Sequence, residues 1–253
     1  MPESFNHETN SMSQPETILD FSRFEFKYVL QKSLREAVES ELQYFMELDP
    51  FVRKSEAQRY QVRSLYFDDP EKTAFYDKID GLRDRSKFRI RTYCRSPDNI
   101  TPVFLEQKGR INNRVLKHRV PLGISDTMPT DFSRLELASD DPVYSTFVYD
   151  SVRKLIEPIA LVDYFRRPYI SRYDHKFRVT FDEQLSAIET TKLFPGKIAT
   201  TKKLLVGYTV MEVKFDRTLP AWFHRIIQSY ELSRQPLSKI CESMITLGMA
   251  VDL

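Results

Sequence analysis

Residues 87–94 read KFRIRTYC, and this stretch indicates how the chain folds. Its basic residues Lys87, Arg89 and Arg91 alternate with the apolar residues Phe88 and Ile90. Alternation with a period of two is typical of a β-strand that has one polar and one apolar face. The predicted strand therefore carries three cations on one face and offers the other face to an apolar partner.

The same alternation recurs along the chain, mostly with cations and a carboxylate on one face. Further strands are predicted at Phe21 to Leu30, Arg59 to Phe67, Pro102 to Lys108, Arg114 to Leu122, Ile159 to Tyr169, Lys176 to Glu183 and Tyr208 to Phe215. The charged faces carry Arg23, Glu25 and Lys27; Glu106 and Lys108; Lys117 and Arg119; Arg178 and Asp182; and Glu212 and Lys214. With helices between the strands, the pattern predicts the α+β class, with eight antiparallel strands in a sheet or barrel.

Helices with apolar stripes are predicted between these strands and after them. Ser33 and Glu36 form a capping-box pattern at the start of the first helix, and later helices are expected at 143–156, 219–232 and 238–249. Residues 1–20 are polar and lack periodicity, so we predict a flexible tail followed by one domain at 21–253.

The direction of the charged faces decides what the protein can bind. For one strand alone, a polar face usually meets water. In a closed barrel, however, the helices need the apolar strand faces on the outside, which leaves the charged faces inside. A cavity lined by cations is costly unless anions enter it, and a linear triphosphate accepts bonds from Arg and Lys along its length. The few carboxylates suit Mg²⁺ or Mn²⁺, which prefer oxygen ligands.

Composition argues against several other classes. The formal net charge of the 253 residues is only +2, although 29% are charged, so the chain lacks the basic excess of a protein that coats nucleic acid. No apolar run approaches the ~20 residues of a membrane helix, and the N-terminus lacks the apolar segment of a signal peptide. Cys94 and Cys241 fit no metal-binding spacing and are expected to be free thiols in the cytoplasm.

Five short segments, taken in order, resemble one known family. They are Phe26-Lys27-Tyr28, Arg63-Ser64-Leu65-Tyr66-Phe67-Asp68, Phe88-Arg89-Ile90-Arg91, Leu105-Glu106-Gln107-Lys108 and Val210-Met211-Glu212-Val213-Lys214. They are similar to the polyphosphate polymerase domain of the vacuolar transporter chaperone (VTC) family, within the CYTH-like superfamily of triphosphate tunnel metalloenzymes. The resemblance runs from about Arg23 to Gly248.

The resemblance implies an eight-stranded antiparallel tunnel that transfers the γ-phosphate of ATP to a growing polyphosphate chain with the help of Mn²⁺ or Mg²⁺. The catalytic cations would be Lys27, Arg89, Arg91, Lys108 and Arg178, and the further phosphate-binding cations Lys117, Arg166, Lys214 and Lys239. Arg167 is an alternative to its neighbour Arg166. A further lysine expected just before Lys239 is replaced by Pro236.

Glu212 would be the metal ligand in this family pattern. The alternative is a plain surface ion pair with Lys214, which lies on the same strand face. Eukaryotic members of the family also carry an inositol-phosphate-sensing domain and membrane helices, and neither is found in this sequence.

Two other functions stay open at this point. The first is a tripolyphosphatase or nucleoside triphosphatase on the same fold, in which water takes the place of the acceptor phosphate. The second is a polyphosphate-binding module without activity. The sequence leaves the oligomeric state, the preferred metal and the physiological substrate undetermined.

Overall fold

The computed structural model describes residues 21–53, 55–96, 102–112, 114–122, 141–196 and 200–251. The predicted tail at 1–20 and nearly all of the connection before the 143–156 helix lie outside these residues. The strands are β1 (Phe21–Gln31), β2 (Met46–Leu48), β3 (Tyr60–Asp68), β4 (Arg85–Thr92), β5 (Val103–Ile111), β6 (Arg114–Leu122), β7 (Glu157–Ser171), β8 (Arg178–Glu189), β9 (Lys202–Lys203) and β10 (Tyr208–Phe215). The helices are α1 (Lys32–Leu42), α2 (Pro50–Arg53), α3 (Thr73–Ile79), α4 (Pro142–Arg153), α5 (Ala221–Ser229) and α6 (Lys239–Leu247).

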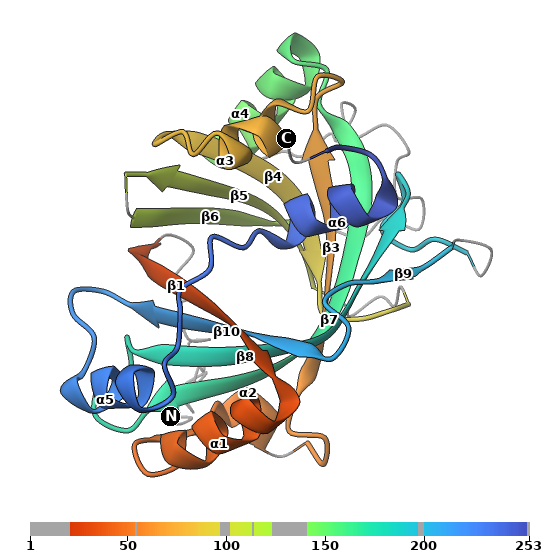
Figure 1. The fold of residues 1–253 in the computed structure, drawn as a ribbon. Coiled ribbons are helices and arrows are strands. Elements are labelled where there is room, and N and C mark those ends of the chain that lie inside the picture. The colour runs from red at the N-terminus through yellow and green to blue at the C-terminus, as the bar shows by residue number, and fades with distance from the viewer. Residues whose placement is uncertain are drawn as a thin grey trace, which may run out of the picture.

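Eight of the strands close into an antiparallel barrel, which confirms the predicted fold class. Their hydrogen-bonded order is β7-β3-β4-β5-β6-β1-β10-β8, and β8 pairs with β7 to complete the ring. The short strands β2 and β9 pair with β7 and β8 outside this ring. In Figure 1, α1, α2 and α5 lie at one side of the barrel and α3 and α4 at the other.

The strand register brings the charged faces together inside the barrel. Lys27 of β1 lies opposite Glu212 of β10, and Arg89 of β4 lies opposite Glu106 of β5. Because side chains alternate between the two faces of a strand, the charged residues two positions away share the same interior.

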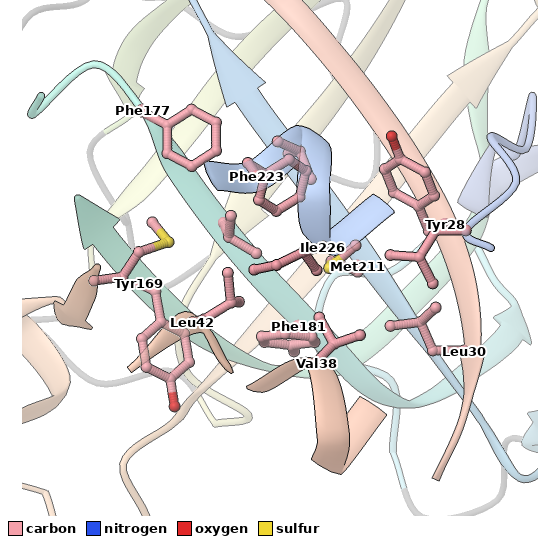
Figure 2. Close-up of a cluster of buried hydrophobic side chains, with 14 of the residues drawn as sticks. Tyr28, Leu30, Val38, Leu42, Tyr169, Phe177, Phe181, Met211, Phe223 and Ile226 are labelled. Atoms are coloured by element: carbon pink, nitrogen blue, oxygen red, sulfur yellow. The ribbon is translucent and has the colours of Figure 1, made fainter. Parts of the chain in front are cut away.

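The opposite strand faces are apolar and are covered by helices. On β1, β8 and β10, the side chains of Tyr28, Phe181 and Met211 pack in one buried cluster with Val38 of α1 and Phe223 of α5 (Figure 2). Burying each such side chain stabilises the fold by about 1.5–3 kcal/mol. This outer packing fixes which face of each strand points inward.

The other half of the barrel has its own cover. Phe147 of α4 packs on Leu65, Ile90 and Leu105, which lie on the outer faces of β3, β4 and β5. The Phe147 ring makes edge-to-face contacts with two aromatic rings of these strands. Each strand thus has an apolar side that a helix buries.

Helix α6 packs differently from the other helices. Its residues Ile240 and Met244 form a buried cluster with Val62 of β3 and with Val162 and Ala187 of β7 and β8. Val62 and Val162 lie an even number of positions before Tyr66 and Tyr164, which line the cavity, so they point to the same interior. This part of the barrel interior is therefore apolar and is closed by α6. The sequence did not predict this apolar part.

The predicted capping box at the first helix is wrong. Helix α1 begins at Lys32, directly after β1, and its N-cap is Gln31 without a side-chain hydrogen bond. An N-cap residue needs extended backbone angles, and Ser33 is already inside the helix. Ser33 therefore cannot cap it, because the strand runs into the helix without a turn.

The remaining expectations concern cysteines and membrane segments. Cys241 in α6 is buried, Cys94 after β4 is half-buried, and both thiols are free. Within the part of the chain that the structure describes, no helix has the length and apolar character needed to cross a bilayer.

Candidate functional site

A cavity of about 190 Å³ lies inside the barrel. Among the described residues, thirteen Lys and Arg side chains line it, against two glutamates. The lining includes these residues that the sequence singled out: Lys27, Arg89, Arg91, Lys108, Lys117, Arg166, Lys214, Lys239 and Glu212.

Glu106 is the centre of one group of cations. Its side chain has no solvent exposure, and Oε2 accepts from Nε of Arg89 at 2.7 Å and lies 2.6 Å from Nη2 of the same residue. Arg91 is 3.7 Å away, and Lys117 contacts the other carboxylate oxygen. Burial would raise the pKa of this carboxyl, but the three cations hold it well below its usual range. Glu106 thus stays charged and orients the two arginines.

Glu212 is the centre of a second group. Its Oε1 accepts from Nζ of Lys239 at 2.7 Å, and its Oε2 lies 3.0 Å from Arg166 and 2.9 Å from Lys214. Asp182 adds a further carboxylate to this group, and its two oxygens accept hydrogen bonds from Arg166 at 2.6 and 2.7 Å. Glu212 is only 5% exposed, so its contact with Lys214 is a buried one, and the alternative of a surface pair is wrong.

Glu25 neutralises a third group of cations. Both of its oxygens accept from Nζ of Lys108, at 3.0 and 3.1 Å, and Lys27 lies 3.4 Å away. Burial lowers the pKa of the Lys108 ammonium to about 8, although Glu25 raises it. Burial likewise lowers the pKa of Lys214 to about 7. These lysines bear charges that a bound anion would stabilise further.

Two tyrosines hold the arginine pair from the opposite side. Nη1 of Arg89 donates to the hydroxyl of Tyr66 at 2.9 Å, and Nη2 of Arg91 donates to the hydroxyl of Tyr164 at 3.2 Å. Burial raises the pKa of Tyr66, but Arg89 and Arg91 outweigh it and bring that pKa to about 8. Sequence reasoning assigned these tyrosines no role, although both occupy inward positions of their strands.

The strap, residues 231–238 between α5 and α6, forms part of the cavity wall. Strand β6 pairs with β1 only at the first three residues of β1. Further along, the backbone N–H of Gln235 donates to the carbonyl of Lys27 at 2.8 Å, and Nζ of Lys27 donates to the carbonyl of Leu237 at 2.9 Å. Figure 1 shows this segment passing β1 on its way to α6. The strap thus places Lys239 in the cavity.

The family pattern predicts a further lysine in the strap just before Lys239, and this chain has Pro236 there. Lys87 of β4 supplies a lysine close to this part of the strap. Pro236 lines the cavity there, and Nζ of Lys87 donates to Oγ of Ser238 at 3.3 Å. The alternation already places Lys87 on the cationic face with Arg89 and Arg91, but the sequence assigns it no role in the site. Arg23 is likewise placed on a charged face without a role in the site, and the remaining unassigned cations of the lining are Lys78, Arg85 and Arg110.

Arg166 and its neighbour Arg167 lie on opposite faces of β7. Arg166 faces the interior and bonds Asp182 and Glu212. Arg167 faces outward, where Nη1 donates to Glu39 of α1 at 3.0 Å. Only Arg166 lines the cavity.

Arg178 is the one predicted catalytic cation that does not line the cavity. Its side chain is 43% exposed, and Nη2 donates to Asp49 at 3.0 Å. It lies opposite Lys214 in the register, but its guanidinium is held by the loop before α2. The structure therefore gives it a peripheral position.

We expect Arg178→Ala to change turnover by less than about fivefold, because an exposed ion pair contributes about 0–1 kcal/mol. The family pattern predicts a large loss for the same variant. Steady-state kinetics of Arg178→Ala beside Arg166→Ala decides between them, since Arg166 lies in the cavity. A loss at Arg178 as large as that at Arg166 would return Arg178 to the site.

The family pattern implies a divalent metal, and the described part of the chain could supply only a few of the ligands that such a metal needs. Among the described residues, no group of three or more His, Cys, Asp or Glu surrounds a common point. Both oxygens of Glu212 already contact cations. Hard divalent ions are often held by one or two carboxylates together with phosphate oxygens and water. A metal that enters with a triphosphate would fit this donor set, and Glu212 would be its protein ligand.

Comparison with known proteins gives one family and several similar folds. The family model described as the VTC domain matches residues 22–247. No curated protein matches the chain. A crystal structure of a candidate adenylate cyclase from Bacillus halodurans is similar with a TM-score of 0.50 and 14% identity over 87% of this chain and 96% of that one. A protein from Pyrococcus horikoshii OT3 gives a TM-score of 0.47 and 12% identity over 90% and 99% of the two chains. The first likeness supports the fold alone.

Proposed function

Because the chain belongs to the VTC domain family, we propose that it is a metal-dependent polyphosphate polymerase, which transfers the γ-phosphate of ATP to a polyphosphate chain inside the barrel. Family and fold together support a tunnel enzyme that acts on triphosphates. The observation that carries the proposal is the lining of the cavity, in which cations greatly outnumber carboxylates. Only a polyanion would neutralise such a surface along its length.

The reaction needs no nucleophile from the protein. A terminal oxygen of the acceptor chain attacks the γ-phosphorus, the bond from this phosphorus to the β-phosphate oxygen breaks, and ADP leaves. The attacking oxygen is already anionic, so no general base is required. Catalysis then consists of positioning and of neutralising charge on the transferred group.

The residues of the cavity suit these two tasks. Arg89 and Arg91 lie two positions apart on β4, about 7 Å along the strand, and are oriented by Glu106 and two tyrosines. They would bind neighbouring phosphates with their guanidinium groups. Lys27 and Lys108 would neutralise the γ-phosphate, and Glu212 would hold Mn²⁺ or Mg²⁺, which supplies further neutralisation of phosphate oxygens when bound.

The test is incubation with γ-labelled ATP and Mn²⁺, with the products separated on a gel. A ladder of labelled polyphosphate is expected. Labelled orthophosphate alone would identify a triphosphatase, and unchanged ATP that still binds would identify a binding module. Either result would contradict the polymerase.

Tripolyphosphate affinity is expected to fall as pH rises above about 7, where Lys214 loses its proton, and to fall further above about 8 because of Lys108. The Lys108 pKa is about 8 in the free protein, and a bound anion raises it, so binding takes up a proton above that pH. For this one proton, the affinity falls by up to about tenfold per pH unit until the pKa of the complex is reached. Calorimetric dissociation constants between pH 7 and 10 measure this.

Lys108→Arg is the matched control for this pH dependence, because a guanidinium stays charged throughout the range. The titration of the ligand itself is common to both proteins and cancels in the ratio of their affinities. A ratio that does not change with pH would show that Lys108 does not titrate on binding.

A further inference from the structure

A second cavity, of about 470 Å³, lies on the outside of the barrel beside the first one. It is formed by the outer faces of β4, β5 and β6 together with α3 and α4. We call it the rim groove. It shares Arg85, Lys87, Gly109 and Arg110 with the interior cavity, so the two meet at the edge of β4 and β5. A ligand in the interior that extends past this edge enters the rim groove.

The rim groove differs from the interior because its floor is apolar and its walls carry carboxylates and cations in similar numbers. Its floor is apolar, with Phe67, Phe88, Leu116 and Ile156. Among the residues that the structure describes, its walls carry five aspartates, and their cations are Lys154 and the shared Arg85, Lys87 and Arg110. The carboxylates and cations of these walls nearly balance, so the groove lacks the cationic excess that would hold a phosphate chain. It suits an uncharged group with a flat apolar part and hydrogen-bond donors.

Three of the five aspartates are already occupied within the protein. Asp68 accepts three backbone N–H groups and Asp69 accepts one, all at or near the start of α3. Asp150 pairs with Lys154 at 3.2 Å. In the part of the chain that the structure describes, the side-chain carboxylates of Asp77 and Asp84 accept no hydrogen bond and form no ion pair, although the backbone carbonyl of Asp77 accepts from the N–H of Leu82 at 3.0 Å. These two carboxylates are acceptors available to a ligand.

The nearby cations do not satisfy these two acceptors. The guanidinium of Arg85 donates to the carbonyl of Leu82, and Nε of Arg110 donates to the carbonyl of Asn112 at 2.8 Å. Along β4, the inward side chains become more buried from Arg85 to Arg91. Arg85 and Arg110 thus mark an entrance from the rim groove to the phosphate-binding cations.

We propose that the rim groove binds the nucleoside end of a nucleoside triphosphate whose phosphates lie in the barrel. The base would lie on the apolar floor, and hydroxyl or amino groups would donate to Asp77 and Asp84. This inference rests on the proposed function and adds two points to it. The α-phosphate lies at Arg85 and Arg110 with the γ-phosphate deepest, and the site distinguishes a nucleotide donor from inorganic polyphosphate, which has no base.

The experiment compares dissociation constants of ATP and tripolyphosphate, measured by calorimetry at fixed salt and Mg²⁺. Asp77→Asn/Asp84→Asn keeps the shape of the groove and removes its charge. ATP affinity is expected to fall by at least about tenfold, since hydrogen bonds to charged acceptors are lost, while tripolyphosphate affinity stays equal or rises. Ser86→Trp, on the outer face of β4, tests the space itself and should weaken ATP alone.

The matched control is Glu41→Gln/Glu56→Gln, which removes two exposed carboxylates that line neither cavity. It should leave both affinities within about twofold. If neither groove variant weakens ATP binding, the nucleoside does not bind in the rim groove, and the proposed phosphate site in the barrel is unaffected. Equal weakening of the two ligands would also contradict nucleoside binding in the rim groove. Wild-type protein that binds neither ligand would overturn this inference and the proposed function together.

Discussion

Replacing Arg91 by alanine is expected to lower kcat/KM by about 10²- to 10³-fold, the usual loss when one preorganised donor to a transition-state oxygen is removed. The fold should persist, because Arg91 makes neutral contacts to Ser64 at 3.1 Å and Tyr164 at 3.2 Å and is 3.7 Å from Glu106. Kinetics and urea denaturation of the variant measure both effects.

Arg89→Ala should lose as much activity and also lose stability. Arg89 makes two of the contacts of Glu106, whose carboxylate is fully buried, and removing one partner of a buried ion pair costs about 3–5 kcal/mol. The sequence predicts the opposite, that removing either arginine relieves repulsion and preserves stability, because it does not show which carboxylate each cation contacts. Arg153→Ala, on the exposed side of α4, is the control and should affect neither quantity. Full activity in Arg91→Ala would remove the arginine pair from the site.

The inward cations could be predicted because they follow a period of two. In the stretch at 87–94, the apolar face of β4 needs a helix to pack against on the outside of the barrel. Arg89 and Arg91, on the other face, are therefore predicted to point inward. The closure of the barrel then follows from eight such strands. These predictions need only local sequence and the physical cost of exposing apolar residues.

The partners of these cations could not be predicted, because they depend on register and on distant segments. Glu106 meets Arg89 through the β4–β5 pairing, and Lys239 reaches Glu212 only because the strap crosses β1. Arg178 obeys the period of two and is still peripheral, because Asp49, 129 positions away, holds it. Alternation predicts the face of a strand, but not where along the barrel a side chain ends.

Irregular strands limit the prediction further. Gln184 in β8 has a positive φ of 53°, and the β7–β8 register shifts near it. One extra residue moves the following side chains to the other face. Asp182 and Ala187, which are an odd number of positions apart, therefore both face the interior. Nothing in the sequence around Gln184 marks this change, so the apolar part of the interior under α6 was not predicted.

Glu212→Gln should abolish turnover while tripolyphosphate still binds as well as before or better. Glutamine keeps the shape of Glu212 and removes the charge that would hold the metal. The cations Arg166, Lys214 and Lys239 then face the cavity with Asp182 as their remaining anion. The free protein should lose about 3–5 kcal/mol of stability, as expected when one partner of a buried ion pair is removed.

Tripolyphosphate should restore much of this stability, because a ligand that binds only the native state stabilises it by mass action and here also replaces the missing anion. The Tm increase on adding tripolyphosphate is therefore expected to be larger in Glu212→Gln than in the wild type. High salt should reduce both increases.

Glu39→Gln is the matched control for Glu212→Gln. Glu39 is also buried and also contacts two arginines, Arg35 and Arg167, but it lies outside the barrel between α1 and β7. Its substitution should lower Tm without affecting turnover, and tripolyphosphate should raise that Tm only as much as in the wild type. Turnover in Glu212→Gln at an ordinary Mn²⁺ concentration would exclude Glu212 as the metal ligand. A Tm increase no larger than in Glu39→Gln would show that the ligand does not replace the charge of Glu212, and would place the phosphates elsewhere.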